Sequence, residues 1–235
     1  LKQTDSYSDN NTGRLNYLAF AFYREIFSRD PFLIKNLMDE YPKQQLKGKQ
    51  KVALLLTMLG LDEKSKSLMD KDQGTDQSVR DWIQQQVPIN PYEVILDPVQ
   101  VDMLWAEFFA AGTYKPVKQL LSALELNKYL GATETLKSAI ENDKVTGKGT
   151  SGNERKQNAY LESTFRTVLW SMRTNAVNSP RVFQYLAWAY ENEELPVSSK
   201  EWLGKALAMA TKDLKNMNSK LEAASVSNIN NKETF

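Results

Sequence analysis

Apolar residues recur at helical spacing along most of the chain. In the first such stripe the apolar positions lie three or four residues apart, or next to each other, at Leu15, Leu18, Ala19, Phe22 and Ile26. This spacing places their side chains on one face of an α-helix. Comparable stripes continue to about residue 222, and no segment shows the period-two alternation of a half-buried strand. We therefore expect an all-α protein.

Prolines mark where several of the expected helices begin. Pro31, Pro98 and Pro180 each follow an aspartate or a serine. The oxygen of such a residue can accept a hydrogen bond from a free N–H group of the first turn, and proline suits the first helical position because no N–H is needed there. With these boundaries the chain divides into about nine helices, which we expect to pack as stacked antiparallel hairpins.

The apolar pattern is weakest between residues 62 and 91, and the segment VPINPYEVILD at residues 87–97 is rich in proline. Proline keeps the residue before it extended. We expect one helical domain over residues 13–222, and any subdomain seam to lie at residues 87–97. Residues 1–12 and 223–235 are polar and are expected to be disordered.

The densest group of aromatic residues lies in the stretch LWAEFFAAGTYKPVKQLLSAL, residues 104–124. Trp105 and Phe108 belong to an apolar stripe, so we expect them in the core of a helical hairpin whose turn follows the glycine of the stretch. Phe109 and Tyr114 would line a groove for a peptide if they stay partly exposed. The preferred interpretation of the stretch as a whole is that of a scaffold.

Two hairpins of the sequence resemble the tetratricopeptide repeat family. In the stretch above and in YLAWAYENEELPVSSKEWLGKAL, an aromatic-rich helix, a break and a helix ending in Ala-Leu follow one another. The positions that fit the family pattern are Trp105, Gly112, Tyr114, Ala123, Leu124, Trp188, Ala189, Tyr190, Ala206 and Leu207. The second hairpin lacks the turn glycine, and no regular period of about 34 residues runs through the chain. The resemblance implies stacked helical hairpins, tetratricopeptide-like or in an irregular superhelix.

A narrower resemblance is carried by two strings of residues. The first is W-x-x-F-F-x-x-G-x-x-x-P-V at Trp105–Val117, and the second is W-S-x-x-x-N-A-x-x-x-P-x-V at Trp170–Val182. Together they look like a group of uncharacterised bacterial helical proteins. This resemblance implies a helical fold and a bacterial source, and it supplies no activity.

The chain of 235 residues contains no cysteine and no histidine. This absence removes disulfides, thiolate and imidazole metal ligands, and nucleophiles activated by histidine. Only carboxylates, Lys, Tyr and hydroxyl groups remain as possible catalytic groups. In the preferred interpretation the chain has no catalytic residues, no metal site and no cofactor. The 30 Lys and Arg nearly balance the 29 Asp and Glu, so no global field attracts nucleic acid. The longest apolar run, VALLLTMLGL from Val52, is about half as long as a membrane span requires, so we expect no integral membrane association.

The composition leaves the compartment open, because a chain without cysteine is compatible with the cytosol, the periplasm and export. The sequence starts with leucine and a polar segment, which is compatible with a mature form whose signal peptide lies upstream. We expect a periplasmic or secreted protein, with a cytoplasmic location as the alternative.

Polar residues on the long helix that follows the Gly-rich loop are the second candidate for partner binding. Arg166, Arg173 and Asn175 lie on or near its polar side, where stacked helical repeats often hold the backbone or a carboxylate of a partner. The alternative is an ordinary solvated helix face. Together with Phe109 and Tyr114, these residues are predicted to bind a protein or peptide. The preferred function is a non-enzymatic binding scaffold of bacterial origin.

The alternative function is a carboxylate-dependent hydrolase or lyase that acts on a carbohydrate-like ligand. Such an enzyme needs two carboxylates roughly 5 to 10 Å apart, here in one aromatic cleft. The acidic residues that would supply them are Asp62, Glu63, Glu107, Glu191, Glu193 and Glu194. An α/α-barrel hydrolase needs about twelve helices, more than the number expected here, so we prefer the binding scaffold.

Overall fold

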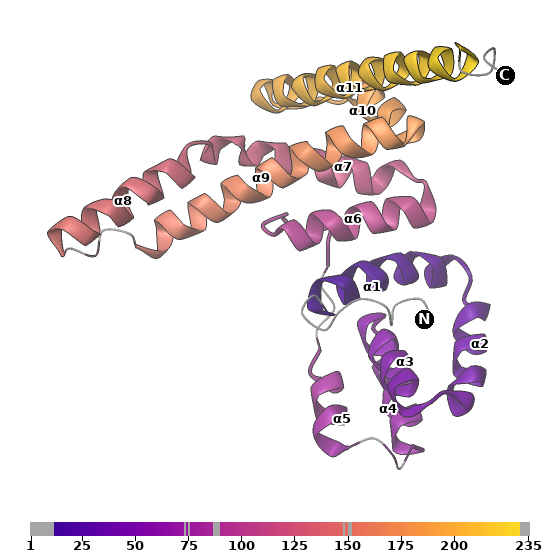
Figure 1. Ribbon diagram of the computed structural model, residues 1–235. Coiled ribbons are helices and arrows are strands. Elements are labelled where there is room, and N and C mark those ends of the chain that lie inside the picture. The colour runs from indigo at the N-terminus through magenta and orange to yellow at the C-terminus, as the bar shows by residue number, and fades with distance from the viewer. Residues whose placement is uncertain are drawn as a thin grey trace. The chain divides into compact units, whose positions relative to one another are not determined.

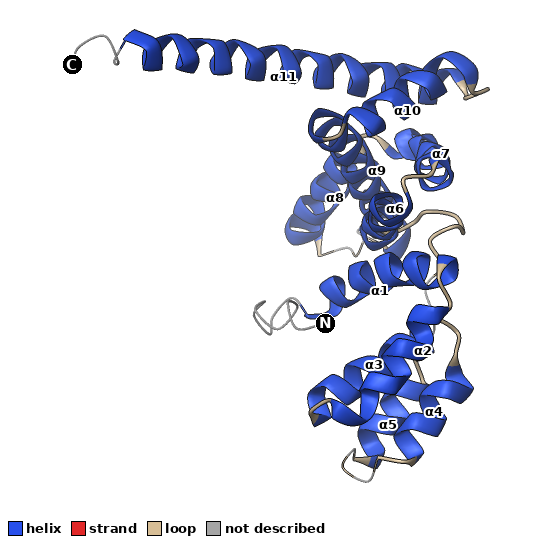
Figure 2. Ribbon diagram, turned by 90° about the vertical axis from the view of Figure 1, so that its right-hand side faces the viewer, coloured by secondary structure: helices blue, strands red, loops and turns tan. Residues whose placement is uncertain are grey.

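The computed structural model describes residues 12–72, 74, 76–86, 90–147, 149 and 152–230 of the chain. In this part of the chain every regular element is a helix and no strand occurs (Figure 1 and Figure 2). The all-α prediction is therefore confirmed. Of the two segments predicted to be disordered, residues 1–11 and 231–235 lie outside the described residues, whereas the last helix extends to Asn230 and is longer than the sequence predicts.

The elements of the N-terminal half are α1 (Thr12–Arg29), α2 (Phe32–Glu40), the 3₁₀ helix η3 (Tyr41–Lys43), α3 (Leu46–Met58), α4 (Asp62–Asp70), α5 (Gln77–Gln84) and α6 (Pro98–Ala111). Those of the C-terminal half are α7 (Tyr114–Ser122), η4 (Ala123–Tyr129), α8 (Ala132–Thr146), α9 (Asn153–Asn178), α10 (Pro180–Asn192) and α11 (Val197–Asn230). Neighbours in sequence often pack against each other, as α3 does with α4 and α8 with α9. Helices α4 and α5 form where the apolar pattern of the sequence is weakest, and the described helices pack against each other as expected.

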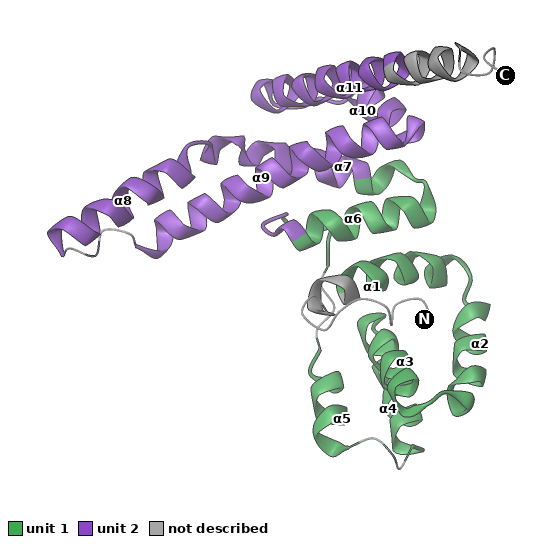
Figure 3. Cartoon of the chain, viewed as in Figure 1, with its two compact units in different colours: residues 1–94, 99–116 green, residues 95–98, 117–235 purple. Residues whose placement is uncertain are grey.

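The chain forms two compact units (Figure 3). Unit 1 consists of Leu1–Val94 and Val99–Pro116, and unit 2 consists of Ile95–Pro98 and Val117–Phe235. The segment at residues 87–97, where the sequence places any seam, contains the first passage of the chain from unit 1 to unit 2. The last passage lies inside α7, where no linker composition marks a boundary.

The core of unit 1 is built around α3, which is buried on more than one side. All of its residues from Val52 to Met58 are buried. The buried residues around it form two clusters, one of Ala53, Leu54, Met58, Met69 and Ile83, and one of Tyr41, Val52, Leu56 and Leu68. A helix with apolar side chains all round is stable inside a core. Helix α3 is therefore the central helix of this unit.

The aromatic stretch in α6 contains two buried rings and one exposed ring. Trp105 is 5% exposed and Phe108 is 2% exposed, and their rings meet edge to face with 5.9 Å between the centroids. Phe109 remains 53% exposed. After α6, Gly112 adopts the left-handed conformation with φ 65°, and its N–H bonds to the Phe108 carbonyl, as expected of a glycine that ends a helix. The core positions of Trp105 and Phe108 are therefore confirmed.

The core of unit 2 centres on α9, whose buried stripe has the helical period. Its apolar members are Leu161, Phe165, Val168, Met172 and Ala176. Helices α8, α10 and α11 and the 3₁₀ helix η4 all pack against α9. At the turn between α9 and α10, the Ser179 side chain accepts a hydrogen bond from the Val182 N–H at 3.4 Å, and Pro180 occupies the first helical position. This arrangement confirms the predicted start of α10.

The adjacent residues Phe108 and Phe109 provide a matched test of the unit 1 core. Phe108→Ala removes a buried ring and leaves a cavity, so the free energy of unfolding of unit 1 is expected to fall by about 3 to 5 kcal/mol. Phe109→Ala removes a half-exposed ring of the same helix and is expected to lower it by about 1 kcal/mol or less. Urea denaturation followed by circular dichroism measures both losses. Equal losses in the two variants would contradict the placement of the two rings.

Candidate functional site

Helix α9 presents an outer face opposite its buried stripe. We define this face by Lys156, Ser163, Arg166, Trp170 and Arg173. Their spacing of three, four or seven residues places them on one side of the helix. Trp170 is 65% exposed. The outer face thus combines cationic side chains with an aromatic ring that lies largely in solvent.

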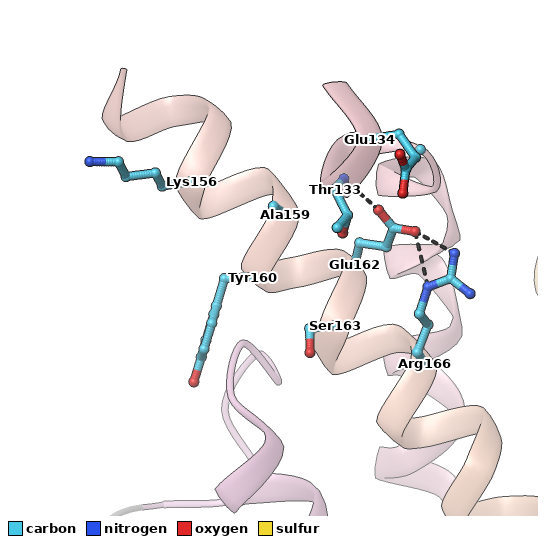
Figure 4. Close-up of a pocket in the computed structure, with 9 residues that line it drawn as sticks. Thr133, Glu134, Lys156, Ala159, Tyr160, Glu162, Ser163 and Arg166 are labelled. Carbon is cyan, nitrogen blue, oxygen red and sulfur yellow. Dashed lines mark hydrogen bonds and ion pairs between the residues drawn. The ribbon is translucent and has the colours of Figure 1, made fainter. Parts of the chain in front are cut away.

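The N-terminal half of this face borders a cleft between α9 and the first turn of α8 (Figure 4). The cleft has a volume of about 590 Å³. Its lining residues are Gly131, Thr133, Glu134, Lys156, Ala159, Tyr160, Glu162, Ser163 and Arg166. In Figure 4, Glu162 and Arg166 extend from α9 toward the start of α8, whereas Lys156 and Tyr160 extend away from it. The cleft therefore has one side of charged, hydrogen-bonded groups and one side formed by a lysine and an aromatic ring.

The carboxylate of Glu162 holds the start of α8 against α9. Its Oε2 accepts a hydrogen bond from the backbone N–H of Thr133 at 2.7 Å. Its Oε1 accepts two hydrogen bonds from Arg166, from Nε at 3.0 Å and from Nη2 at 2.6 Å. The residue before α8, Gly131, has φ 89° and no side chain that could cap the helix. Glu162 therefore supplies, from a neighbouring helix, the acceptor that a capping residue normally supplies.

This environment keeps Glu162 ionised. The side chain is only 1% exposed, and burial alone would raise its pKa. The hydrogen bonds from Thr133, Arg166 and Gly131 outweigh burial and lower the pKa of Glu162 to about 2. The N-terminal end of the α8 dipole also favours a negative charge at this position. Glu162 is therefore a charged structural group at neutral pH and not a proton donor.

The C-terminal half of the outer face is held by a second ion pair. Arg173 donates from Nε to Asp213 Oδ2 at 2.6 Å and from Nη2 to Oδ1 at 2.9 Å, a bidentate arrangement that links α9 to α11. The hydrogen bonds from Arg173 lower the pKa of Asp213. Since Arg166 is held by Glu162, both arginines beside Trp170 are fixed by carboxylates of unit 2.

On the other side of the cleft, Tyr160 is fixed by its hydroxyl group. The hydroxyl donates to Asp97 Oδ2 at 2.7 Å. One turn later, the single hydroxyl hydrogen of Thr164 is shared between the Tyr160 carbonyl at 3.2 Å and the Leu96 carbonyl, in the same segment as Asp97, at 3.3 Å. Tyr160 nevertheless remains 43% exposed. It therefore offers a positioned aromatic surface beside Lys156.

The five predicted partner-binding residues fall into two groups. Arg166 and Arg173 lie on the outer face of α9, and Asn175 lies half-buried near the end of the same helix. Phe109 and Tyr114, which are exposed and half-buried respectively, belong to unit 1. The two arginines therefore share one helix face, and the two aromatic residues belong to the other unit.

Sequence reasoning missed the residues that complete the outer face. Trp170 comes four residues after Arg166 and three before Arg173, so the helical period places it between them. Lys156 precedes Arg166 on the same side of the helix and carries the same kind of signal. The role of Glu162 has no such signal, because an acidic residue four positions before an arginine is typical of an exposed ion pair.

None of the acidic residues considered for catalysis lines this cleft. Glu107, for example, is buried in α6 and paired with Arg24. The carboxylates of the cleft belong to Glu134, which is exposed and paired with Lys137 at 2.8 Å, and to Glu162, both of whose oxygens accept hydrogen bonds. Glycoside cleavage by two carboxylates needs one of them to be protonated at the start. The low pKa of Glu162 removes it from that role.

Comparison with models of known protein families, with curated proteins and with solved structures finds no match for this chain. Among the described residues, no three or more acidic side chains are grouped so that they could hold a metal ion. In the same part of the chain, no helix combines the length and the apolar content needed to cross a membrane.

Replacing Glu162 with glutamine tests its charge as well as its contacts. Because its folded pKa of about 2 lies below the ordinary value of 4.5, ionised Glu162 stabilises the fold at neutral pH. This stabilisation, on the order of 3 kcal/mol, is present above about pH 5 and is lost as the pH falls toward 2. We expect Glu162→Gln to unfold more easily at neutral pH, and its stability to change less than that of the wild type between about pH 6 and pH 3.

The control for this experiment is Glu201→Gln, which changes an exposed glutamate of α11. It is expected to leave the pH dependence of unfolding as it is in the wild type. Thermal unfolding followed by circular dichroism over the same pH range compares the three proteins. If Glu162→Gln keeps the full pH dependence of the wild type, the capping role of Glu162 is wrong.

Proposed function

We propose that this chain is a non-enzymatic helical scaffold of bacterial origin that binds a protein or peptide, with a tetratricopeptide-like arrangement of its helices. The observation that carries this proposal is the outer face of α9, where an exposed tryptophan lies between two arginines that are already held in place. Helix packing supports the scaffold part, because α11 packs against both α9 and α10. The first helix of a following hairpin does the same in a stack of helical hairpins.

Trp170 and its neighbours have the composition of an interface centre. Tryptophan and arginine are among the residues most enriched at positions that contribute most to binding free energy. Trp170 leaves 65% of its surface in solvent. Covering an indole ring removes a large apolar area from water. A partner that covers Trp170 would therefore gain apolar burial together with hydrogen bonds from Arg166 and Arg173.

The two arginines are ordered before any partner binds. Immobilising a flexible side chain at an interface costs about 0.5 to 1.5 kcal/mol. Glu162 and Asp213 already immobilise Arg166 and Arg173 through two hydrogen bonds each. Each guanidinium has further N–H donors beyond those two. A partner can therefore use these donors without the full entropic cost of ordering the side chains.

A catalytic function has less support from the same residues. Both oxygens of Glu162 accept hydrogen bonds, and its pKa of about 2 keeps it ionised. The chain also lacks cysteine and histidine, which supply most other acid–base and nucleophilic groups. We therefore propose binding and not catalysis. The periplasmic or secreted location stays a prediction from the sequence.

Substitution of the exposed tryptophan tests this proposal. We expect Trp170→Ala to lose, by at least about tenfold, the partner that the wild-type chain captures from an extract of its source organism, since a central interface tryptophan contributes about 2 kcal/mol or more. Because most of the ring lies in solvent, the free energy of unfolding is expected to stay within about 0.5 kcal/mol of the wild type. Quantitative affinity capture with mass spectrometry measures the first effect, and urea denaturation measures the second.

Trp82→Ala is the matched control, because Trp82 is 51% exposed and lies on α5 in unit 1. This variant is expected to capture the same partner as the wild type. A partner that Trp170→Ala still captures, or that both variants lose equally, would contradict the assignment of binding to α9. Turnover of a carbohydrate-like substrate by the wild-type chain would favour the hydrolase or lyase instead.

A further inference from the structure

We infer that the outer face of α9 takes an extended acidic peptide segment, with two carboxylates about four to five residues apart and an apolar residue shortly after the second. This inference rests on the proposed function, because it names the partner chemistry of the same face. It goes further by specifying the sign of the partner's charge and the spacing of its groups.

The ion pair at the cleft turns its positive end outward. The side chain of Arg166 is 66% exposed, whereas that of Glu162 is 1% exposed. The charge of Glu162 is also stabilised by the Thr133 N–H in the first turn of α8. A partner therefore meets the guanidinium and not the carboxylate that balances it. The accessible charge at this point of the face is positive.

A second cation lies toward the start of α9. Lys156 is exposed, lines the cleft and forms no ion pair within the described part of the chain. Glu134, the exposed acidic residue of the cleft, is paired with Lys137. Neither carboxylate of the cleft is therefore bound to Lys156, and a carboxylate of a partner can take that place.

The distance between these cations sets the spacing of the ligand. Lys156 and Arg166 lie about 15 Å apart along the helix axis, since an α-helix rises about 1.5 Å per residue. An extended chain advances about 3.3 to 3.6 Å per residue, so carboxylates about four to five residues apart match this separation along the axis. From Arg166 to Trp170 the axis advances about 6 Å, so an apolar residue about two positions further reaches the indole ring.

The middle of the cleft suits the backbone of such a peptide. Ala159 is small, and Ser163 adds a hydroxyl group between the two cations. The ring of Tyr160, positioned by its hydrogen bond to Asp97, forms a wall beside them. These residues combine an apolar surface with a hydrogen-bonding group, as grooves that hold extended peptides do.

Fluorescence anisotropy with the full chain of 235 residues tests this inference. The probe is a labelled peptide of about seven residues, with glutamate at the first and fifth positions, leucine at the seventh and serine or threonine elsewhere. Its control carries glutamine in place of both glutamates. We expect the glutamate peptide to bind at least about tenfold more tightly at low salt, and this ratio to shrink as salt is raised, because exposed charges are screened.

Three substitutions assign the effect to this face. Lys156→Gln leaves the contacts of Glu162 in place and is expected to weaken binding of the glutamate peptide about three- to fivefold, with no change for the glutamine peptide. Lys215→Gln makes the same change in net charge at an exposed position of α11 and is expected to affect neither peptide. Trp170→Ala is expected to weaken both peptides by a similar factor, because the ring makes an apolar contact. Circular dichroism checks that each variant is folded.

Equal binding of the two peptides, no binding of either at millimolar concentration, or equal effects of Lys156→Gln and Lys215→Gln would each overturn the inference. A short single-stranded DNA is added as a competitor. If it binds more tightly than the glutamate peptide, the face is a nucleic-acid site and the inference is wrong. Trp170-dependent capture of a native partner, combined with equal binding of the two peptides, would leave the scaffold function in place and remove only the acidic ligand.

Discussion

The candidate site depends on the buried carboxylate of Glu162. Burying a charged side chain is unfavourable unless its hydrogen bonds to water are replaced, and here the Thr133 N–H and the Arg166 guanidinium replace them. This requirement fixes the position of the start of α8, the direction of the Arg166 side chain and the ionised state of Glu162 together. Gly131 adopts a left-handed conformation directly before α8. The cleft lies beside the first turn of α8, which Glu162 holds against α9.

A similar ion pair recurs about two turns later along α9, with a different degree of burial. Arg173 is held by Asp213, whose side chain is 29% exposed, whereas the side chain of Glu162 is 1% exposed. Because the Asp213 carboxylate is accessible to solvent, it competes with a partner's carboxylate for the guanidinium of Arg173. The Glu162 carboxylate is buried and bound to the N-terminus of α8, so its negative charge is not exposed beside Arg166. The outer face is therefore more positive at Arg166 than at Arg173, which places the inferred acidic contacts at the cleft end.

Periodicity predicts most of this fold and less of its site, for a physical reason. Stripes of apolar residues determine which side of a helix is buried, and Trp105 and Phe108 are buried for that reason. The burial of Glu162 depends instead on a contact with Thr133, 29 positions away in the sequence. The division into two units depends on long-range contacts as well, and no change of composition marks it inside α7. The outer face of α9 can be derived from the sequence as a helix face, but the cleft beside it is formed only when α8 packs.

The two strings of residues that carry the narrower resemblance show which of their positions the fold requires. The residues of the strings that are buried or that begin or end a helix are Trp105, Phe108, Gly112, Pro116, Val117, Ser171, Ala176, Pro180 and Val182. Each string leaves one aromatic residue largely in solvent, Phe109 at 53% in the first and Trp170 at 65% in the second. The Phe109 ring packs edge to face on the buried Phe108 ring, with 5.3 Å between the centroids, whereas Trp170 lies outside the buried stripe of α9. Trp170 lies between two arginines on its own helix, whereas α6 contains no basic residue. An exposed aromatic ring and positive charge therefore occur together on the helix of Trp170 and not on that of Phe109.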